Sequence, residues 1–256
     1  MGKLIRMDLY RMLKSRSFLI CLLLAFALAL GMAPFGRLLF TLARSFSAEV
    51  RDMGMSEASL ATLLTNPFPL VNLMLALLSL CWFFYADVEN GYIKNIAGQM
   101  PMKGFTILSR FIAAAVHNLL FAAVGIIGNL IGTMLVQRFE MDASVLETVR
   151  VLVLKLLLVQ SISAALLLVV STFRSKSFGM ILAVLFGLSL TPLLYMGINE
   201  GLRQLFGPET DISKYMPDTV MEEHPLDTLK ALATAVGWSA VLLVPAVRIF
   251  DRKDVK

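Results

Sequence analysis

Residues 151–173 have the sequence VLVLKLLLVQSISAALLLVVSTF, in which Lys155 is the single charged residue. A helix needs about 20 predominantly apolar residues to cross the hydrocarbon core of a bilayer. A transmembrane β-strand would be about 10 residues long, with alternating apolar and polar side chains. The stretch therefore predicts a transmembrane helix, which satisfies every backbone polar group within its own segment.

Five more apolar stretches of similar length occur along the 256-residue chain, at about 18–36, 68–86, 111–136, 178–198 and 231–250. Hydrophobic residues make up 58% of the chain and charged residues 16%, whereas soluble proteins average about 45–50% and about 25%. We therefore expect one all-α integral membrane domain over residues 1–256, with six transmembrane helices and no soluble catalytic domain.

The segments between these stretches differ in charge. If the N-terminus is cytoplasmic, the inner segments hold 14 Lys and Arg residues and the outer segments 7. Acidic residues are divided the other way, with 5 inside and 13 outside. Because basic residues concentrate on the cytoplasmic side of membrane proteins, both termini are predicted to be cytoplasmic.

Residues 3–16 combine basic and apolar side chains at helical spacing and predict a basic amphipathic helix on the inner membrane surface. Its apolar face would contain Leu4, Ile5, Leu9, Met12 and Leu13. A cleaved signal peptide is the alternative for this region. We favour an uncleaved first span, because the basic segment is long and the apolar run continues past the sequence Ala27-Leu28-Ala29.

Motifs for catalysis and metal binding are missing from the sequence. It contains no HExxH zinc pair, no GxSxG nucleophile elbow and no GxxxxGK[ST] phosphate loop. Cys21 and Cys81 lie in apolar runs without metal-ligand spacing. We therefore expect neither an enzyme nor a chain with its own metal or cofactor. The net charge of +5 follows from the loop charges, so no nucleic-acid partner is expected.

Polar residues within the expected spans are few: Asn72, His117, Asn118, Asn129, Lys155 and Gln160. Each can hydrogen-bond to a neighbouring helix or contact a substrate, and Lys155 is near enough to the outer end of its span to reach the membrane surface. Gly128 and Gly132 form a GxxxG motif, which is typical of a close helix contact either within one chain or between two chains.

Residues 85–103, after the second stretch, have the sequence YADVENGYIKNIAGQMPMK. Asn90-Gly91 is a turn signal, and Tyr92, Ile93 and Ile96 then fall on one side of a short helix. A partly apolar helix on the cytoplasmic side either docks on a partner or lies on the membrane surface.

Two segments resemble the permease subunits of type-2 ATP-binding-cassette exporters. In that family the N-terminal helix ends near an "lfrsk" pattern, to which LYRMLKSR at 9–16 is similar. After the second span the family has an acidic residue, three others and Gly-Thr-Ile-Lys-Asn. Tyr92 replaces the threonine in this chain, and the matching residues are Asp87, Gly91, Ile93, Lys94 and Asn95. The size and single-domain form look most like lantibiotic-immunity and bacitracin-resistance permeases.

The resemblance implies a permease that exports an amphipathic or peptide-like substrate across a bacterial cell membrane. ATP and Mg would bind to two copies of a separate ATPase, and a second permease chain, identical or different, would complete the pathway. The implied ATPase contact consists of Asp87, Glu89, Gly91, Tyr92, Lys94 and Asn95. The resemblance implies that the second and fifth spans line the interface between the two permease chains. The candidate pathway residues there are Asn72, Phe83, Thr191 and Tyr195.

Two alternatives stay open. A membrane enzyme or a membrane assembly or anchor protein would also lack a phosphate loop, so that absence does not distinguish them from a permease. The outer segment 199–227 has seven acidic and two basic residues, a formal charge of −5. It either attracts a cationic peptide or is acidic only because basic residues are retained inside.

Cysteine-accessibility labelling in intact cells tests the orientation. A cysteine in place of Lys253 should be protected from a membrane-impermeant reagent, because the C-terminus is expected in the cytoplasm. A cysteine in place of Asp211 should be labelled. Labelling of the first from outside, or no labelling of the second, would contradict the predicted topology.

Overall fold

The computed structural model describes residues 1–46, 58–69, 71–89, 104–136, 139–140, 144–173, 175–207, 211–223 and 226–252. The long helices are α2 (Arg16–Phe46), α5 (Asn72–Glu89), α7 (Phe105–Met134), α8 (Val145–Phe173) and α12 (Thr228–Arg252). The shorter helical elements are α1 (Gly2–Lys14), α4 (Leu60–Thr65), α9 (Lys176–Gly187), α10 (Thr191–Phe206), η1 (Ser213–Tyr215) and α11 (Pro217–Glu222). Two short strands, β1 (Ala58–Ser59) and β2 (Phe139–Glu140), pair in parallel.

Four helices, α2, α7, α8 and α12, are long and apolar enough to cross a membrane. The bent pair α9 and α10 forms a fifth candidate, whereas the apolar part of α5, Asn72–Ala86, is shorter. The predicted all-helical class is therefore confirmed, as four to five long apolar helices that are consistent with an integral membrane protein. A six-span arrangement requires α5 to cross as well, and it stays a prediction.

The fifth predicted stretch, 178–198, is not one continuous helix. It divides into α9 and α10, which are bent by 97° relative to each other. The cause lies in the sequence at Pro192, near the start of α10. A proline ring clashes with the carbonyl of the fourth residue before it, here Leu188, so an α-helix cannot run through this point undisturbed.

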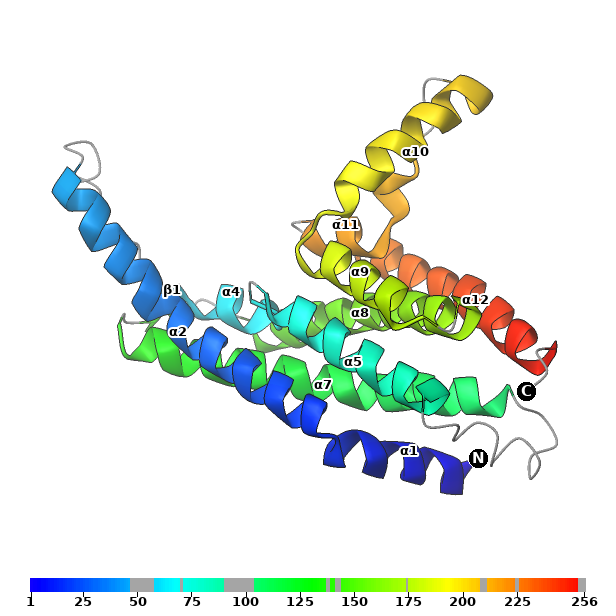
Figure 1. Cartoon of the computed structure of the whole chain (residues 1–256). Coiled ribbons are helices and arrows are strands. Elements are labelled where there is room, and N and C mark those ends of the chain that lie inside the picture. The colour runs from blue at the N-terminus through cyan, green and yellow to red at the C-terminus, as the bar shows by residue number, and fades with distance from the viewer. Residues whose placement is uncertain are drawn as a thin grey trace.

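Helix α5 lies at the centre of the bundle, in contact with α2, α7, α8 and α9 (Figure 1). None of its residues from Leu73 to Ala86 is exposed. Its fully buried side chains include Leu77, Leu80 and Phe84, which belong to the main hydrophobic core. A helix that is apolar on all sides is expected in such an interior position.

The GxxxG motif of α7 lies at a contact within the chain. A Cβ at Gly128 would be 2.9 Å from the Cβ of Ala29, and one at Gly132 would be 2.2 Å from the carbonyl oxygen of Leu30. Both neighbours belong to α2. Of the two alternatives that the sequence left open, the glycines therefore serve the internal packing of α2 against α7.

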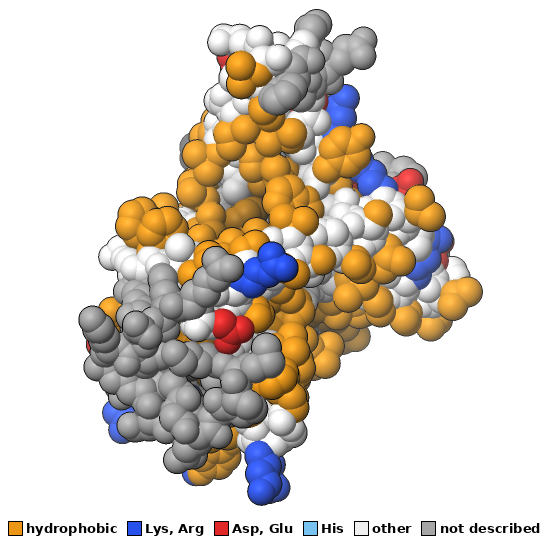
Figure 2. Space-filling view, turned by 90° about the vertical axis from the view of Figure 1, so that its right-hand side faces the viewer, with side chains coloured by type: hydrophobic (Ala, Val, Ile, Leu, Met, Phe, Trp, Pro, Cys, Tyr) orange, Lys and Arg blue, Asp and Glu red, His pale blue; other side chains and the backbone are white. Residues whose placement is uncertain are grey.

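Apolar side chains also cover much of the outer surface. Leu23 of α2, Leu193 of α10 and Val241 of α12 are each more than 60% exposed, and hydrophobic side chains extend over the face shown in Figure 2. Soluble proteins rarely expose apolar patches larger than a few hundred Å². Such a surface is suited to contact with lipid tails, in agreement with the composition.

Replacing Gly132 with Val tests the contact between α2 and α7. The added side chain meets backbone atoms of α2, so the helices must separate, and overpacking of this kind costs about 1–3 kcal/mol. We expect a lower thermal unfolding midpoint in detergent. Gly31→Val is the matched control, because no atom lies within 4 Å of a Cβ at that position. Equal midpoints for the two variants would contradict the assigned contact.

Candidate functional site

Helix α1 is the N-terminal helix that the sequence predicts, and it packs against α7. Leu4, Asp8 and Met12 form its buried stripe, at a spacing of four residues. The carboxylate of Asp8 accepts a hydrogen bond of 2.5 Å from the Ser109 hydroxyl of α7. A polar contact therefore fixes α1 to the bundle, in addition to the apolar face that its sequence indicates.

The beginning of α7 and the end of α12 meet close to this contact. The backbone N–H of Gly104 donates a hydrogen bond of 2.6 Å to Asp251, and the Arg110 guanidinium lies 6.0 Å from the centre of the Phe250 ring. A Cβ at Gly104 would approach Val247 to 2.6 Å. These contacts bring the two termini of the chain to the same end of the bundle (Figure 1).

The predicted ATPase-contact residues begin at this end. Glu89 is the last residue of α5 and is exposed, and Asp87 lies in the last turn of the same helix. Gly91, Tyr92, Lys94 and Asn95 lie outside the described residues. The described part of the chain stops at Glu89 and resumes at Gly104, whose backbone N–H is bonded to Asp251.

The predicted pathway residues Thr191 and Tyr195 lie one turn apart on α10, and both are buried. Each hydroxyl donates a hydrogen bond to the same carboxylate, that of Asp218 at the start of α11. Asp218 is only 5% exposed. A carboxylate at a helix N-terminus is stabilised by the helix dipole, as Asp218 is at the start of α11. Its two hydrogen bonds join α11 to the beginning of α10, next to the break in the span.

The other two pathway residues, Asn72 and Phe83, lie on α5. Phe83 packs beside Phe84 in the main core, with ring centres 5.8 Å apart. Asn72, eleven positions earlier, is roughly 16 Å away along the helix. Asn72 is fully buried, and its amide makes no hydrogen bond with any described residue. The structure thus does not bring the four predicted residues together at one place.

Three other polar residues of the spans hydrogen-bond between helices. His117 of α7 lies 3.1 Å from the Ser79 hydroxyl of α5. Asn118 donates to Gln160 and to Ser163 of α8, at 3.0 and 2.9 Å. Gln160 in turn donates to the carbonyl of Phe111. For these residues the contact with a neighbouring helix is confirmed, and it links α7 to both α5 and α8.

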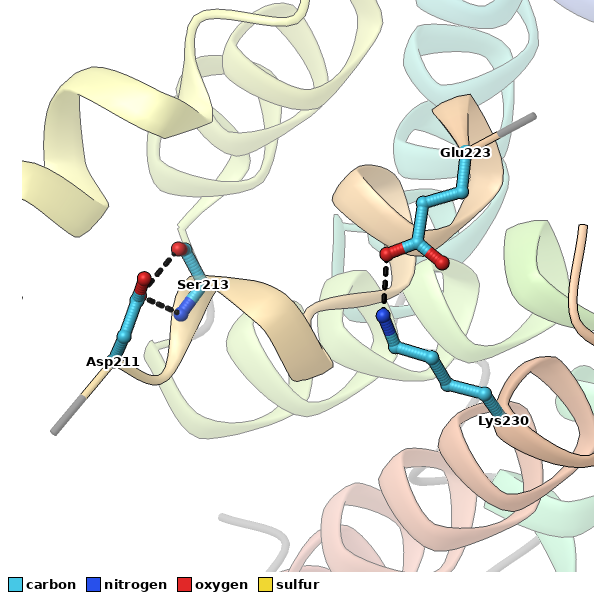
Figure 3. Close-up of polar contacts among 4 residues, drawn as sticks. All are labelled: Asp211, Ser213, Glu223 and Lys230. Atoms are coloured by element: carbon cyan, nitrogen blue, oxygen red, sulfur yellow. Dashed lines mark hydrogen bonds and ion pairs between the residues drawn. The ribbon is translucent and has the colours of Figure 1, made fainter. Parts of the chain in front are cut away.

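Two acidic residues of the segment 199–227 make the polar contacts shown in Figure 3. Asp211 accepts hydrogen bonds from the hydroxyl and backbone N–H of Ser213, and these donors lower the pKa of its carboxyl below the usual value. Glu223 forms an ion pair with Lys230. Among these described carboxylates, Lys230 offsets the charge of Glu223, whereas Asp211 keeps its negative charge.

Three carboxylates have structural roles that the sequence did not predict: Asp8, Asp218 and Asp251. Each is joined by a hydrogen bond to a residue far away in the sequence. A signal existed only for Asp8, which is the one acidic residue within the basic segment 3–16.

No protein-family model matches this chain, and no curated protein sequence matches it.

Replacing Asp218 with Ala tests whether it holds the broken span. The hydroxyls of Thr191 and Tyr195 would lose their shared acceptor, and an unsatisfied buried polar group costs about 1–3 kcal/mol. We expect a lower thermal unfolding midpoint in detergent and partial recovery in Asp218→Asn, which keeps an acceptor oxygen. Glu200→Ala is the control, because Glu200 is exposed on α10. If the control lowers the midpoint as much as Asp218→Ala, the cluster has no special role.

Proposed function

We propose that this chain is the membrane-spanning permease subunit of an ATP-driven exporter of the type-2 ATP-binding-cassette class. In this proposal it lies in a bacterial cell membrane with both termini cytoplasmic. It pairs with a second permease chain and expels an amphipathic or peptide-like substrate, as lantibiotic-immunity permeases do. ATP and Mg bind to two copies of a separate ATPase, and the permease itself has no catalytic site.

The observation that carries the proposal is the common location of α1 and of the two ends of the connection 90–103. Residues 9–16 and 87–95 carry the resemblance to the exporter family, although they are far apart in the sequence. Helix α1, the C-terminal end of α5 and the N-terminal end of α7 lie at the same end of the bundle (Figure 1). An ATPase docked there would meet both segments at once.

The mechanical arrangement of this end supports the same proposal. Gly104 is tied to Asp251 of α12, and α1 is tied to α7 by Asp8 and Ser109. Movement of the connection would therefore be transmitted to α5 at one side and to α7 and α12 at the other. Because α5 is the central helix, a displacement there reaches every helix that it contacts.

Reversing the charge of Lys94 tests the proposed ATPase contact. The first step is to determine whether the neighbouring gene encodes an ATPase with a GxxxxGK[ST] loop, and such an ATPase is then co-expressed with the chain. We expect Lys94→Glu and Gly91→Val to reduce both co-purification of the ATPase and its stimulated activity by about tenfold or more. A loss of this size corresponds to about 1.4 kcal/mol, and a charged contact is worth at least that much.

Arg248→Glu serves as the matched control for this experiment. Arg248 is exposed on α12 at the same end of the bundle, so the charge change is the same and the connection is untouched. The control should retain ATPase binding and activity. Full binding and activity in both connection variants would refute the docking role, and a membrane anchor or enzyme would become the better explanation.

A further inference from the structure

A cavity of about 400 Å³ opens beside the break between α9 and α10. Its walls come from α4, from the segment before α5, from α8, from the break itself and from α11. The residues that matter most for its chemistry are Phe68, Leu73, Lys155, Ser189, Met221 and Glu222. Cavities of roughly 300–1,000 Å³ are the size of small-molecule sites.

Lys155 is the unusual member of this lining. It lies on α8, roughly 15 Å from the start of the helix, and is only 8% exposed. No described residue accepts a hydrogen bond from its ammonium group or forms an ion pair with it. Glu222 is the carboxylate that acts on it electrostatically. The lining mixes apolar side chains with four uncharged polar ones, Thr62, Thr65, Asn66 and Ser189. A buried ammonium is costly unless it is paired and hydrogen-bonded, and Glu222, the carboxylate in the same lining, forms no ion pair with it.

The opposite wall of the cavity is built by the helix break. Ser189 has a positive φ of 51°, and the backbone N–H groups of Ser189 and Leu190 bond back to the carbonyls of Phe186 and Leu185. This is the pattern of a Schellman C-cap, in which glycine is the usual residue. The Ser189 hydroxyl instead donates to Glu222 at 2.9 Å. This bond joins the exposed Glu222 to the break, and Glu222 forms no ion pair with Lys155.

We propose that this cavity binds a singly charged phosphate group, which pairs with Lys155. The apolar side chains of Phe68, Leu73 and Met221 receive the aliphatic part next to that group. Glu222 disfavours more highly charged anions by repulsion. The inference does not rest on the proposed ATPase partnership, because it concerns binding to the isolated chain.

Binding is measured on the purified protein in an uncharged maltoside detergent. The probes are short-chain phosphatidylglycerol, inorganic phosphate and short-chain phosphatidylcholine, whose head group is neutral overall. Occupancy by native mass spectrometry and the rise in thermal midpoint are the two readouts, since a ligand that binds only the folded state stabilises it. We expect phosphatidylglycerol to bind at least tenfold more tightly than phosphatidylcholine.

Variants at Lys155 locate the binding. Lys155→Gln should lower the affinity for phosphatidylglycerol at least tenfold, and Lys155→Arg should retain it. Lys214→Gln is the matched control, because Lys214 is exposed on η1 and does not line the cavity. Glu222→Gln should leave the affinity unchanged or raise it, since a competing negative charge is removed.

Ligand-free stability provides a second measurement that does not depend on the probe. Lys155→Met should raise the thermal midpoint of the unliganded protein, because a buried ammonium without a hydrogen bond is replaced by an apolar side chain of similar length. A lower midpoint would mean that Lys155 is already paired within the protein, and it would overturn the proposal.

The probes also distinguish the source of the anion. Binding of phosphatidylglycerol alone, dependent on Lys155, identifies a lipid head group. Binding of inorganic phosphate with the same dependence identifies a free anion, and both results support an anion site. Equal binding by wild type and Lys155→Gln, equal affinity for phosphatidylcholine, or no binding of either anion would overturn it.

Discussion

Every backbone N–H and C=O group in hydrocarbon must find a partner within the protein. This constraint explains why the long apolar segments of the chain are helices. It also makes the break between α9 and α10 costly, since three residues leave the helical pattern there. These residues still satisfy their backbone donors, because the N–H groups of Leu188, Ser189 and Leu190 all donate hydrogen bonds to carbonyls of α9. Ser189 adopts a left-handed conformation, which costs about 1–2 kcal/mol for a residue with a Cβ.

Side chains from the following segment then stabilise the broken span. Asp218 accepts from Thr191 and Tyr195, and Glu222 accepts from Ser189. Both carboxylates belong to α11, which packs on α8 and α12. Helix α11 therefore supports the break through two of its carboxylates. These two acidic residues have structural roles.

The two ends of the bundle are built differently. At the end with both termini, polar contacts join α1 to α7 and α7 to α12, and they surround the ends of the connection 90–103. At the other end, the break and α11 contribute to the lining of a cavity that contains the buried Lys155. An exporter needs an energy-coupling surface on one side and ligand contact toward the other. The proposed function and the proposed anion site are compatible with this division, although each is tested separately.

The sequence alone determined the helical membrane class, the approximate positions of the helices and the amphipathic α1, because apolar length and spacing are local properties. The division of α9 from α10 also had a local signal in Pro192. Only the tertiary structure decided which polar groups meet. Asp8 pairs with Ser109 and Thr191 with Asp218 across 101 and 27 residues. Lys155 has no ion pair with a described residue because of how helices distant in the sequence pack around it. The local sequence does not predict that packing.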